Sequence, residues 1–523
     1  MTKPLEQVVA KKLHCRQQEI KELVIVRRSI DARRKPHIYF VFTVDVKLAD
    51  ENKVWPYCQG NKDVRRLEEK TWPPVQTGTR PLAHRPVVVG TGPSGLAAAL
   101  ELARHGYQPV VYERGCDVDT RAAHVEEFWQ TGYFRPESNV QFGEGGAGTF
   151  SDGKLTTRVN HPLLPRILQA FVDAGAPEEI RYAYNPHVGT DVLRRVVRNM
   201  RQTIEKLGGT IYFNSCVTGI TRAADGHITA VTINGTETVE TDVVIMGIGH
   251  SARDTYYMLY DQGVTLERKD FAVGVRIEHD QDVIDRSQYG CSAADLGLDA
   301  ADYSLVYHDK VSGRSCYSFC MCPGGVVVAA ASEAGGVVTN GMSLYKRDSG
   351  IANSALVVNV TADDVGGDSP LAGIEFQRKY ERLAYKAGSG TYKAPAETVG
   401  HFLGRPEPGR LPQLTSYRPG VVWTDLRTVL PSFVTDTLAE ALPYFGRRIH
   451  GFDDNNAVMT GVETRTSAPV RIVRGEDRAA VQAAGLYPVG EGAGYAGGIM
   501  SAFLDGLETA LAIITIYQPL EEK

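Results

Sequence analysis

The sequence predicts an α/β protein whose main domain has a Rossmann-like dinucleotide-binding fold, and three neighbouring observations predict it. Residues 87–95 read Val-Val-Val-Gly-Thr-Gly-Pro-Ser-Gly, a short buried strand followed by a glycine turn. Residues 96–103 favour a helix, and residues 110–113, Val-Val-Tyr-Glu, favour a second strand that ends in an acid. Strand, glycine triplet, helix, strand and acid in this order are much more specific than a glycine triplet alone.

Each part of the glycine turn has a physical role in binding a dinucleotide. Gly90 permits the tight turn, Gly92 lets the backbone approach a pyrophosphate, and Gly95 lets the helix pack close to the strand. Pro93 and Ser94 begin the helix, where the positive end of the helix dipole favours phosphate. These residues are therefore predicted to bind the nucleotide.

The acid after the second strand indicates which nucleotide is bound. Glu113 stands 18 residues after Gly95, where a carboxylate can accept hydrogen bonds from a ribose 2′-OH, and Arg114 follows it. An acid here favours FAD or NAD over NADP. The alternative is a glycine-rich turn that binds no ligand, and the complete order of elements disfavours it.

A second glycine-rich loop covers residues 142–155. Five of its first twelve residues are glycines, so the backbone can pass close to a flat ligand and donate N–H groups to it. Lys154 could place a cation near a flavin ring and favour its anionic reduced form. A flexible surface loop is the alternative, and the apolar residues of the segment disfavour it. The predicted ligand contacts of this loop are Gly145, Gly146, Ala147 and Ser151.

A third loop covers residues 486–502 and combines a strand, a glycine-rich turn and a helix start. Glu491 follows Gly490 and could accept a hydrogen bond from a ribityl hydroxyl. The N–H groups near Gly498 and Ile499 could face the pyrophosphate or the pyrimidine edge of a flavin. Two such loops and the first glycine turn are more than NAD requires, so the sequence predicts FAD. Three further predicted contacts are Val217, Gly247 and Gly249.

The order of these segments predicts a nucleotide-binding sheet that begins near residue 87 and is completed near residue 490. Residues 189–207 favour an amphipathic helix, and residues 210–233 favour the strands of a small β-meander. The predicted domains are a small basic N-terminal α/β domain of ferredoxin-like type (1–75), a linker (76–86), the first part of a FAD-binding domain (87–250), an inserted α+β cap or substrate domain (251–460), and the second part of the FAD-binding domain (461–523).

The 523-residue chain is 43% hydrophobic and 23% charged, which is typical of a soluble globular protein. Residues 1–75 hold 16 Lys and Arg against 10 Asp and Glu, whereas the remainder holds 41 against 52. The basic segment could bind an acidic partner or RNA, but docking on the acidic body of its own chain is favoured. The chain shows no signal peptide, no apolar run near ~18 residues and only eight cysteines, so a cytoplasmic location is expected.

Four residues are candidates for substrate-side chemistry. Lys154 could tune the flavin, and His250 is a candidate acid–base residue, although a lone histidine is more often structural. Arg465, with Glu463, could bind an anionic substrate or lock a domain interface. Cys322 is the candidate active-site thiol, but small buried thiols are the favoured interpretation of Cys316, Cys320 and Cys322, and a metal site is the least favoured.

These motifs together resemble those of the FAD-dependent dehydrogenases of the NAD(FAD)-utilising type, in the glutathione-reductase-like flavoprotein superfamily. The resemblance covers nearly the whole chain and includes residues 29–33, 90–95, 142–155, 249–254, 271–279, 319–325, 461–469 and 490–501. It implies that Gly90, Gly92, Gly95 and Glu113 bind the ADP half of FAD, and that Gly145, Gly146 and Ser151 approach the flavin. Glu491 takes the place of an aspartate that is more frequent in the superfamily.

The sequence therefore predicts a FAD-dependent oxidoreductase that transfers a hydride between flavin N5 and an organic small molecule under the 251–460 domain. A second complete glycine fingerprint for NAD(P)H is missing, so the electron donor or acceptor stays open, with NAD(P)H possible without a domain of its own. The alternative is a flavoprotein that binds or modifies RNA, or binds a protein, through its basic N-terminal domain. Neither a membrane nor nucleic acid is the expected partner.

Overall fold

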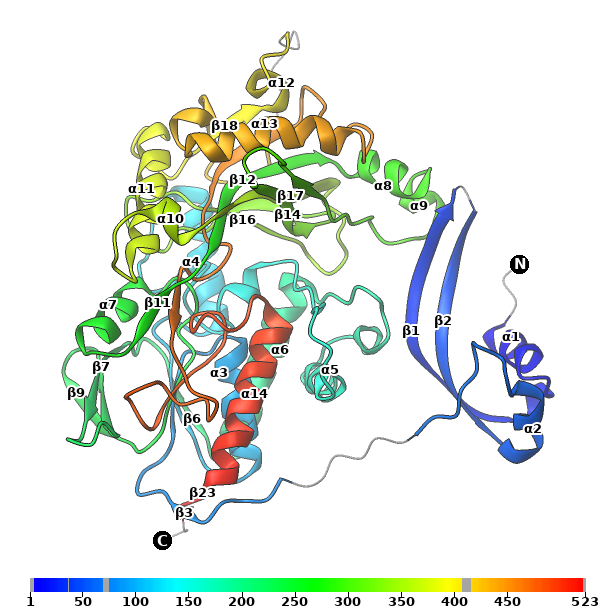
Figure 1. The fold of residues 1–523 in the computed structure, drawn as a ribbon, viewed down its shortest axis with the longest axis horizontal. Helices are drawn as coiled ribbons and strands as arrows, with labels where there is room; N and C mark the ends of the chain where they lie inside the picture. Colours follow the sequence, from blue (N-terminus) through cyan, green and yellow to red (C-terminus); the bar gives the residue numbers. More distant parts are fainter. Residues whose placement is uncertain (1–3, 36, 69–74, 407–414, 521–523) are drawn as a thin grey trace.

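The computed structural model describes residues 4–35, 37–68, 75–406 and 415–520 and shows two central sheets with helices around them (Figure 1). The first sheet is parallel and has the strand order β22-β10-β4-β5-β6. Its strands are three residues long, and most of them are fully buried, which explains their valine-rich sequences. Their bounds are β4 (Val87–Val89), β5 (Val110–Tyr112), β6 (Thr210–Tyr212), β10 (Val244–Met246) and β22 (Leu486–Pro488).

The strands of this sheet come from two distant parts of the sequence, because β22, near the C-terminal end, pairs with β10. Helices α3 (Pro93–Arg104) and α14 (Ile499–Ile516) lie side by side over one face and share a hydrophobic core with it (Figure 1). The other face packs against α7 (Arg253–Asp261) and a three-stranded meander, β7 (Val217–Arg222), β8 (Ile228–Ile233) and β9 (Glu237–Glu240). Residues 210–213, predicted for the meander, instead supply the edge strand β6, because they pair with β5.

Helix α14 is long and apolar enough to cross a membrane by length and composition alone, with a mean hydropathy of 1.7. The sequence interpretation found no such segment. In the structure 61% of the helix is buried inside the protein. Asp505 near its middle pairs with Arg474 and Arg478 at 2.6 and 2.9 Å. These features are those of a core helix, and one such helix is weak evidence for a membrane span.

The second sheet has seven strands in the order β13-β14-β17-β12-β20-β18-β19 and lies above the first in Figure 1. Helices α11 (Ala372–Ala387) and α13 (Ser432–Gly446) pack against it. The predicted boundary at 460/461 needs correction, because it cuts β20, whose whole length belongs to this sheet. The strand bounds are β12 (Phe271–Asp280), β13 (Val306–His308), β14 (Ser315–Cys322), β17 (Ile351–Val360), β18 (Ala394–Thr398), β19 (Val421–Trp423) and β20 (Val458–Glu463).

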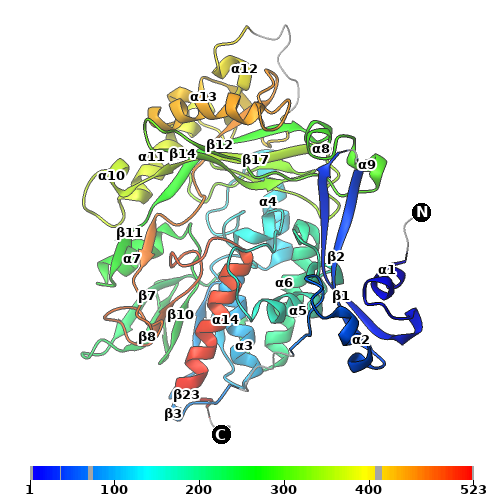
Figure 2. The same ribbon diagram turned by 45° about the vertical axis from the view of Figure 1, so that its right-hand side comes forward.

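The N-terminal segment is a long β-ribbon with two helices at its base, and it stands to one side of the body in both views (Figure 1, Figure 2). The predicted ferredoxin-like domain is wrong, since the described part of residues 1–75 has one sheet of two antiparallel strands. The end of that domain, residues 69–74, lies outside the described residues. The elements are α1 (Leu5–Lys12), β1 (Ile20–Arg34), β2 (His37–Leu48) and α2 (Glu51–Cys58).

The remaining elements connect these layers. Helix α6 (Gly189–Lys206) matches the predicted amphipathic helix, and α4 (Val118–Thr131) and α5 (Leu164–Asp173) flank it. Two short strands, β15 (Val326–Ala329) and β16 (Thr339–Met342), form a hairpin. The others are β3 (Arg80–Pro81), β11 (Leu266–Arg268), α8 (Gln281–Tyr289), α9 (Ala293–Leu296), α10 (Ala362–Val365), α12 (Val399–Phe402), β21 (Val470–Ile472) and β23 (Tyr517–Gln518).

Candidate functional site

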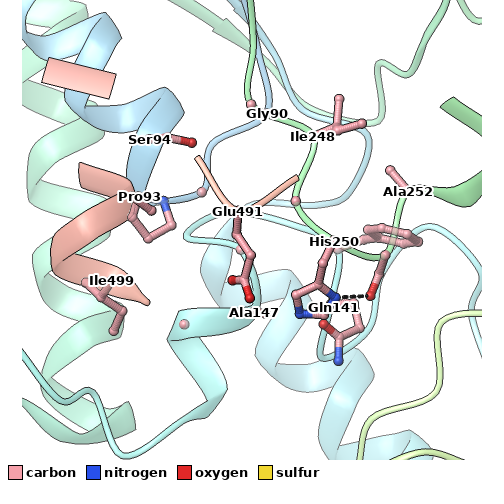
Figure 3. A pocket seen from close by; sticks show the side chains of 18 of the residues that line it. Gly90, Pro93, Ser94, Gln141, Ala147, Ile248, His250, Ala252, Glu491 and Ile499 are labelled. Atoms are coloured by element: carbon pink, nitrogen blue, oxygen red, sulfur yellow. Dashed lines mark hydrogen bonds between the residues drawn. The ribbon is translucent and has the colours of Figure 1, made fainter. Parts of the chain in front are cut away.

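A cavity of about 350 Å³ extends from the carboxyl ends of β4 and β10 to the second sheet (Figure 3). Residues of β14, β16 and β20 close it on the side of the second sheet. A cleft at the carboxyl ends of parallel strands is where such folds bind nucleotides. Most of the predicted cofactor-binding residues line it: Gly90, Gly92, Pro93, Ser94, Glu113, Arg114, Gly146, Ala147, Ser151, Val217, Gly247, Gly249, Glu491, Gly498 and Ile499.

Three predicted contacts lie behind the cavity wall. A Cβ at Gly95 would overlap the carbonyl oxygen of Gly90, so this glycine lets α3 pack on the first turn. A Cβ at Gly145 would overlap the Thr149 hydroxyl, and one at Gly490 would overlap the side chain of Ser94. These glycines allow the close packing of the three loops, whereas the residues next to them in the sequence line the cavity.

The backbones of the first and second loops approach each other closely at Gly92 and Gly146, and both glycines line the cavity. A Cβ on Gly146 would lie 3.0 Å from the Gly92 Cα, and Gly146 has a φ of +62°, which favours glycine. Gly92 caps α3, and among the described residues no side chain caps that helix. Its first N–H groups are therefore available to an anionic ligand.

Arg465 lines the cavity but is held by the protein. Its Nε and Nη2 donate to the two carboxylate oxygens of Glu381 at 2.7 and 3.1 Å, and its Nη1 donates to Ser332 at 3.0 Å. Arg253 of α7 donates to the same carboxylate at 2.8 Å. Burial alone would raise the pKa of Glu381, but the two arginines hold it well below its usual value. The sequence left two roles open for Arg465, substrate binding and the locking of a domain interface. This geometry matches the second.

His250 is buried, and its Nδ1 lies 2.8 Å from the Ser251 hydroxyl (Figure 3). Burial, with the charges of Arg465 and Arg253 nearby, lowers its pKa to about 3. An acid–base group works best when its pKa is near the working pH. The structure therefore argues against the acid–base role predicted for His250 and places a neutral ring in the cavity wall.

The candidate thiol also needs correction. Cys322 is fully buried outside the cavity, and Cys320 lines the cavity instead. In a regular strand Cys320 and Cys322 would face the same side. A register shift between Phe319 and Cys322 breaks that alternation, and Cys320 has a φ of +46°. Burial raises the pKa of both thiols, so neither is a ready nucleophile.

Sequence reasoning missed several residues of the cavity wall. Cys320 was predicted to be a small buried thiol. Phe319 and Thr466 lie in segments that carry the family resemblance, but neither was singled out, because these side chains reach the cavity only through tertiary packing. Asn340 is one example, since it lies in the short uncharged strand β16. The other missed residues include Gln141, Ser215, Cys216, Ile248, Phe319 and Thr466.

Comparisons with known proteins agree with this architecture. Residues 88–141 match the NAD(P)-binding Rossmann-like domain, residues 130–261 match the flavin containing amine oxidoreductases, and residues 270–466 match the FAD-dependent protein, C-terminal domain-like family. Residues 2–47 match a domain of unknown function. An uncharacterised protein of Clostridium beijerinckii is 48% identical over 511 residues, which cover 98% of this chain and 95% of that protein.

The chain belongs to a family of FAD-dependent oxidoreductases. Solved structures that it resembles include CtdE in complex with FAD (13% identity, 83% and 84% of the two chains, TM-score 0.32) and a 2-methyl-3-hydroxypyridine-5-carboxylic acid oxygenase mutant (11% identity, 83% and 82%, TM-score 0.33). Both TM-scores are below 0.5, so these structures say nothing specific about the site of this oxidoreductase.

Glu491 is the acceptor that the sequence predicts for the ribityl chain of FAD, and it lines the cavity. Figure 3 shows its carboxylate pointing into the cavity towards Ala147. No residue in the described ranges forms a hydrogen bond or ion pair with this carboxylate. Burial raises its pKa to about 7, although Lys269 opposes the shift. The side chain is half-buried and its carboxylate faces the cavity, so a ribityl hydroxyl is a donor that fits it.

Glu113 lies at the cavity, but its carboxylate already has protein donors. One oxygen accepts from the Thr91 N–H and hydroxyl at 2.8 and 2.7 Å. The other accepts from the N–H groups of Gly115 and Gly143 at 2.9 and 3.0 Å. These bonds use the four lone-pair positions of a carboxylate. A ribose hydroxyl would have to replace one of them, so the ribose contact stays a prediction.

Proposed function

We propose that the chain is a dehydrogenase-type flavoenzyme that exchanges a hydride between flavin N5 and an organic small molecule. The observation that supports this best is that one continuous cavity joins the predicted nucleotide-binding turns of the first sheet to the strands of the second. One end has the features of a FAD site, and the other end leaves room under β14 and β16 for a substrate. FAD, when bound, supplies the two-electron redox chemistry.

In this proposal the residues of the chain bind and orient FAD and shield its reacting end from water. The turn at Gly92 and the start of α3 bind the diphosphate, and Glu491 orients the chain between the diphosphate and the ring. Strands β14, β16 and β20 cover the reacting end and exclude water from it. Lys154 is the predicted group that tunes the flavin, since His250 is neutral and Arg465 is paired.

The electron donor or acceptor is proposed to dock without a domain of its own. The described part of the chain contains one parallel sheet of Rossmann order, and the FAD site occupies its cleft. NAD(P)H fits this proposal. A cytoplasmic location is also proposed, because all eight cysteines are free thiols. The comparisons lend no support to the alternative role in RNA or protein binding.

Anaerobic photoreduction of the purified protein tests this function. We expect a yellow protein whose flavin is reduced by two electrons and is reoxidised slowly by O₂ but quickly by an artificial acceptor. Rapid reoxidation by O₂ would indicate an oxidase or oxygenase. A protein that stays colourless after incubation with FAD would overturn the proposal.

A further inference from the structure

The end of the cavity under the second sheet has its own set of side chains, which we call the cap end: Lys154, Phe319, Cys320 and Asn340. Lys154 comes from the second glycine loop, and the others come from β14 and β16. Arg276 joins the two strands, because it donates to the Cys320 carbonyl of β14 at 2.9 Å and to the Asn340 side chain of β16 at 3.2 Å. The cap end is separate from the turns at Gly90 and Glu113.

Lys154 is the one cation of the described cavity wall without a protein partner. No hydrogen bond or ion pair involves its ammonium group in the described ranges. Asp152 is nearby, but both of its carboxylate oxygens already bind Arg347, at 3.0 and 2.5 Å. Three other charged groups of the wall are in ion pairs: Arg114 with Glu137 and Asp254, Arg465 with Glu381, and Glu463 with Arg276.

Asn340 adds a second donor without a partner. Its Oδ1 accepts from Arg276 Nη2 at 3.2 Å and from the Gly341 N–H at 2.8 Å. Because arginine can only donate, this contact fixes which end of the amide is the oxygen. The Nδ2 group is then left with two N–H donors and no acceptor among the described residues. The orientation of the amide therefore favours an acceptor in the cavity.

We propose that the cap end binds the carboxylate of an anionic organic substrate, held between Lys154 Nζ and Asn340 Nδ2. The inference rests on the proposed function, since the substrate would lie beside the flavin. Two donor groups with one positive charge match the two oxygens and single charge of a carboxylate. The Phe319 ring offers an apolar wall for the rest of the molecule.

The same set of charges disfavours an amine substrate. An ammonium group at the cap end would meet the like charge of Lys154. The free carboxylate among the described lining residues is Glu491, which belongs to the third loop and fits the cofactor. The cap end therefore favours a negatively charged substrate over a positively charged one, a preference that the sequence alone did not decide.

Three probes with one ring and different charges test this inference: benzoate, benzyl alcohol and benzylamine. Each is titrated into the FAD-loaded full chain while the visible spectrum of the flavin is recorded. We expect benzoate to perturb the spectrum saturably and at lower concentrations than the other two. Lys154→Met and Asn340→Leu should each weaken benzoate binding, the first by roughly 10- to 100-fold, as expected for a charged hydrogen bond. Lys154→Arg should keep the preference for benzoate.

Lys206→Met, at the exposed end of α6, is the matched control and should bind benzoate as the wild type does. Equal binding of the three probes, no saturable response to benzoate, or wild-type benzoate binding by Lys154→Met overturns the inference. A changed form of the reduced flavin in Lys154→Met with unchanged benzoate binding leaves Lys154 only the flavin-tuning role of the proposed function and overturns the inference. A colourless protein contradicts the proposed function, whereas a yellow protein without a carboxylate preference contradicts this inference alone.

Discussion

At the scale of single residues, the first glycine loop makes a prediction that separates binding from folding. A Cβ on Gly92 would lie 3.9 Å from the Gly146 Cα, which is an ordinary contact, so Gly92→Ala should leave the FAD-free protein as stable as the wild type. With FAD bound, the methyl group would crowd the diphosphate. Overpacking costs about 1–3 kcal/mol, so the Kd for FAD should rise roughly 5- to 150-fold.

Equilibrium titration of the FAD-free protein with FAD measures this change, and thermal unfolding of the same sample checks the fold. Gly336→Ala is the control, because Gly336 does not line the cavity and its Cβ would lie 3.4 Å from that of Glu381, which is also an ordinary contact. Unchanged FAD affinity in Gly92→Ala would mean that the diphosphate lies elsewhere.

Glu491 makes a second prediction at this scale, through its pKa of about 7 in the FAD-free fold. Burial raises this pKa above the unfolded value of about 4.3, so the unfolded chain loses its proton first as pH rises. The stabilisation is fully present below pH ~4.3 and is lost as pH rises to about 7. The contribution to the free energy of unfolding is roughly 1–3 kcal/mol. It is smaller than the full pKa difference would give, because the half-buried side chain faces the solvent-accessible cavity.

Urea unfolding of the FAD-free protein between pH 4.5 and 8 tests this. Glu491→Gln should remove that part of the pH dependence, so the difference between variant and wild type should change with pH and level off above pH ~7. Parallel curves for the two proteins would show that Glu491 titrates normally.

At the scale of secondary-structure elements, Glu381 of α11 joins the end of β20 to α7 through two arginines. Arg465→Met would leave Arg253 as the main partner of a buried carboxylate. Breaking a buried ion pair on one side costs about 3–5 kcal/mol, so we expect a loss near the lower end of that range. Thermal and urea unfolding measure it, and Lys206→Met is again the control. A variant that stays stable but binds benzoate more weakly would restore the substrate-binding role.

The same scale shows what the sequence could predict. The strand, glycine turn and helix around Gly92 were predictable, because each depends on residues close in the chain. The face of Cys322 was not, since one bulge in β14 reverses the alternation that periodicity assumes. The position of Asn340 in the cavity wall was not predictable either, because it depends on the packing of β16 beside β20. The ferredoxin-like domain was predicted wrongly, because the 15-residue strand β1 pairs along its length with β2 and the described part of residues 1–75 adds no further strand.

At the scale of the whole molecule, the β-ribbon is nearly independent of the body. Its helices and strands share a small core of their own around Val9, Leu13, Val54 and Cys58. In the described residues, backbone hydrogen bonds join Arg28 of the ribbon to residues 182–184 of the body, and the Lys35 side chain donates to the Ser287 carbonyl. A cavity of about 400 Å³ lies between the ribbon and the body, and Ile30 and Phe40 at its wall stay partly exposed.

Deletion of residues 1–75 should therefore leave FAD binding intact. No described residue of this segment lines the FAD cavity, and the two hydrophobic cores around the parallel sheet contain none of its described residues below 75. We expect residues 76–523 to hold about one FAD per chain with the wild-type visible spectrum, measured by absorbance after extraction of the flavin. Val75 packs against the core of α3 and α14, and the first deletion removes it. A second truncated chain, residues 69–523, keeps Val75 and so separates loss of this contact from loss of the ribbon. Loss of FAD from both truncated chains would show that the ribbon is part of the folding unit of the body.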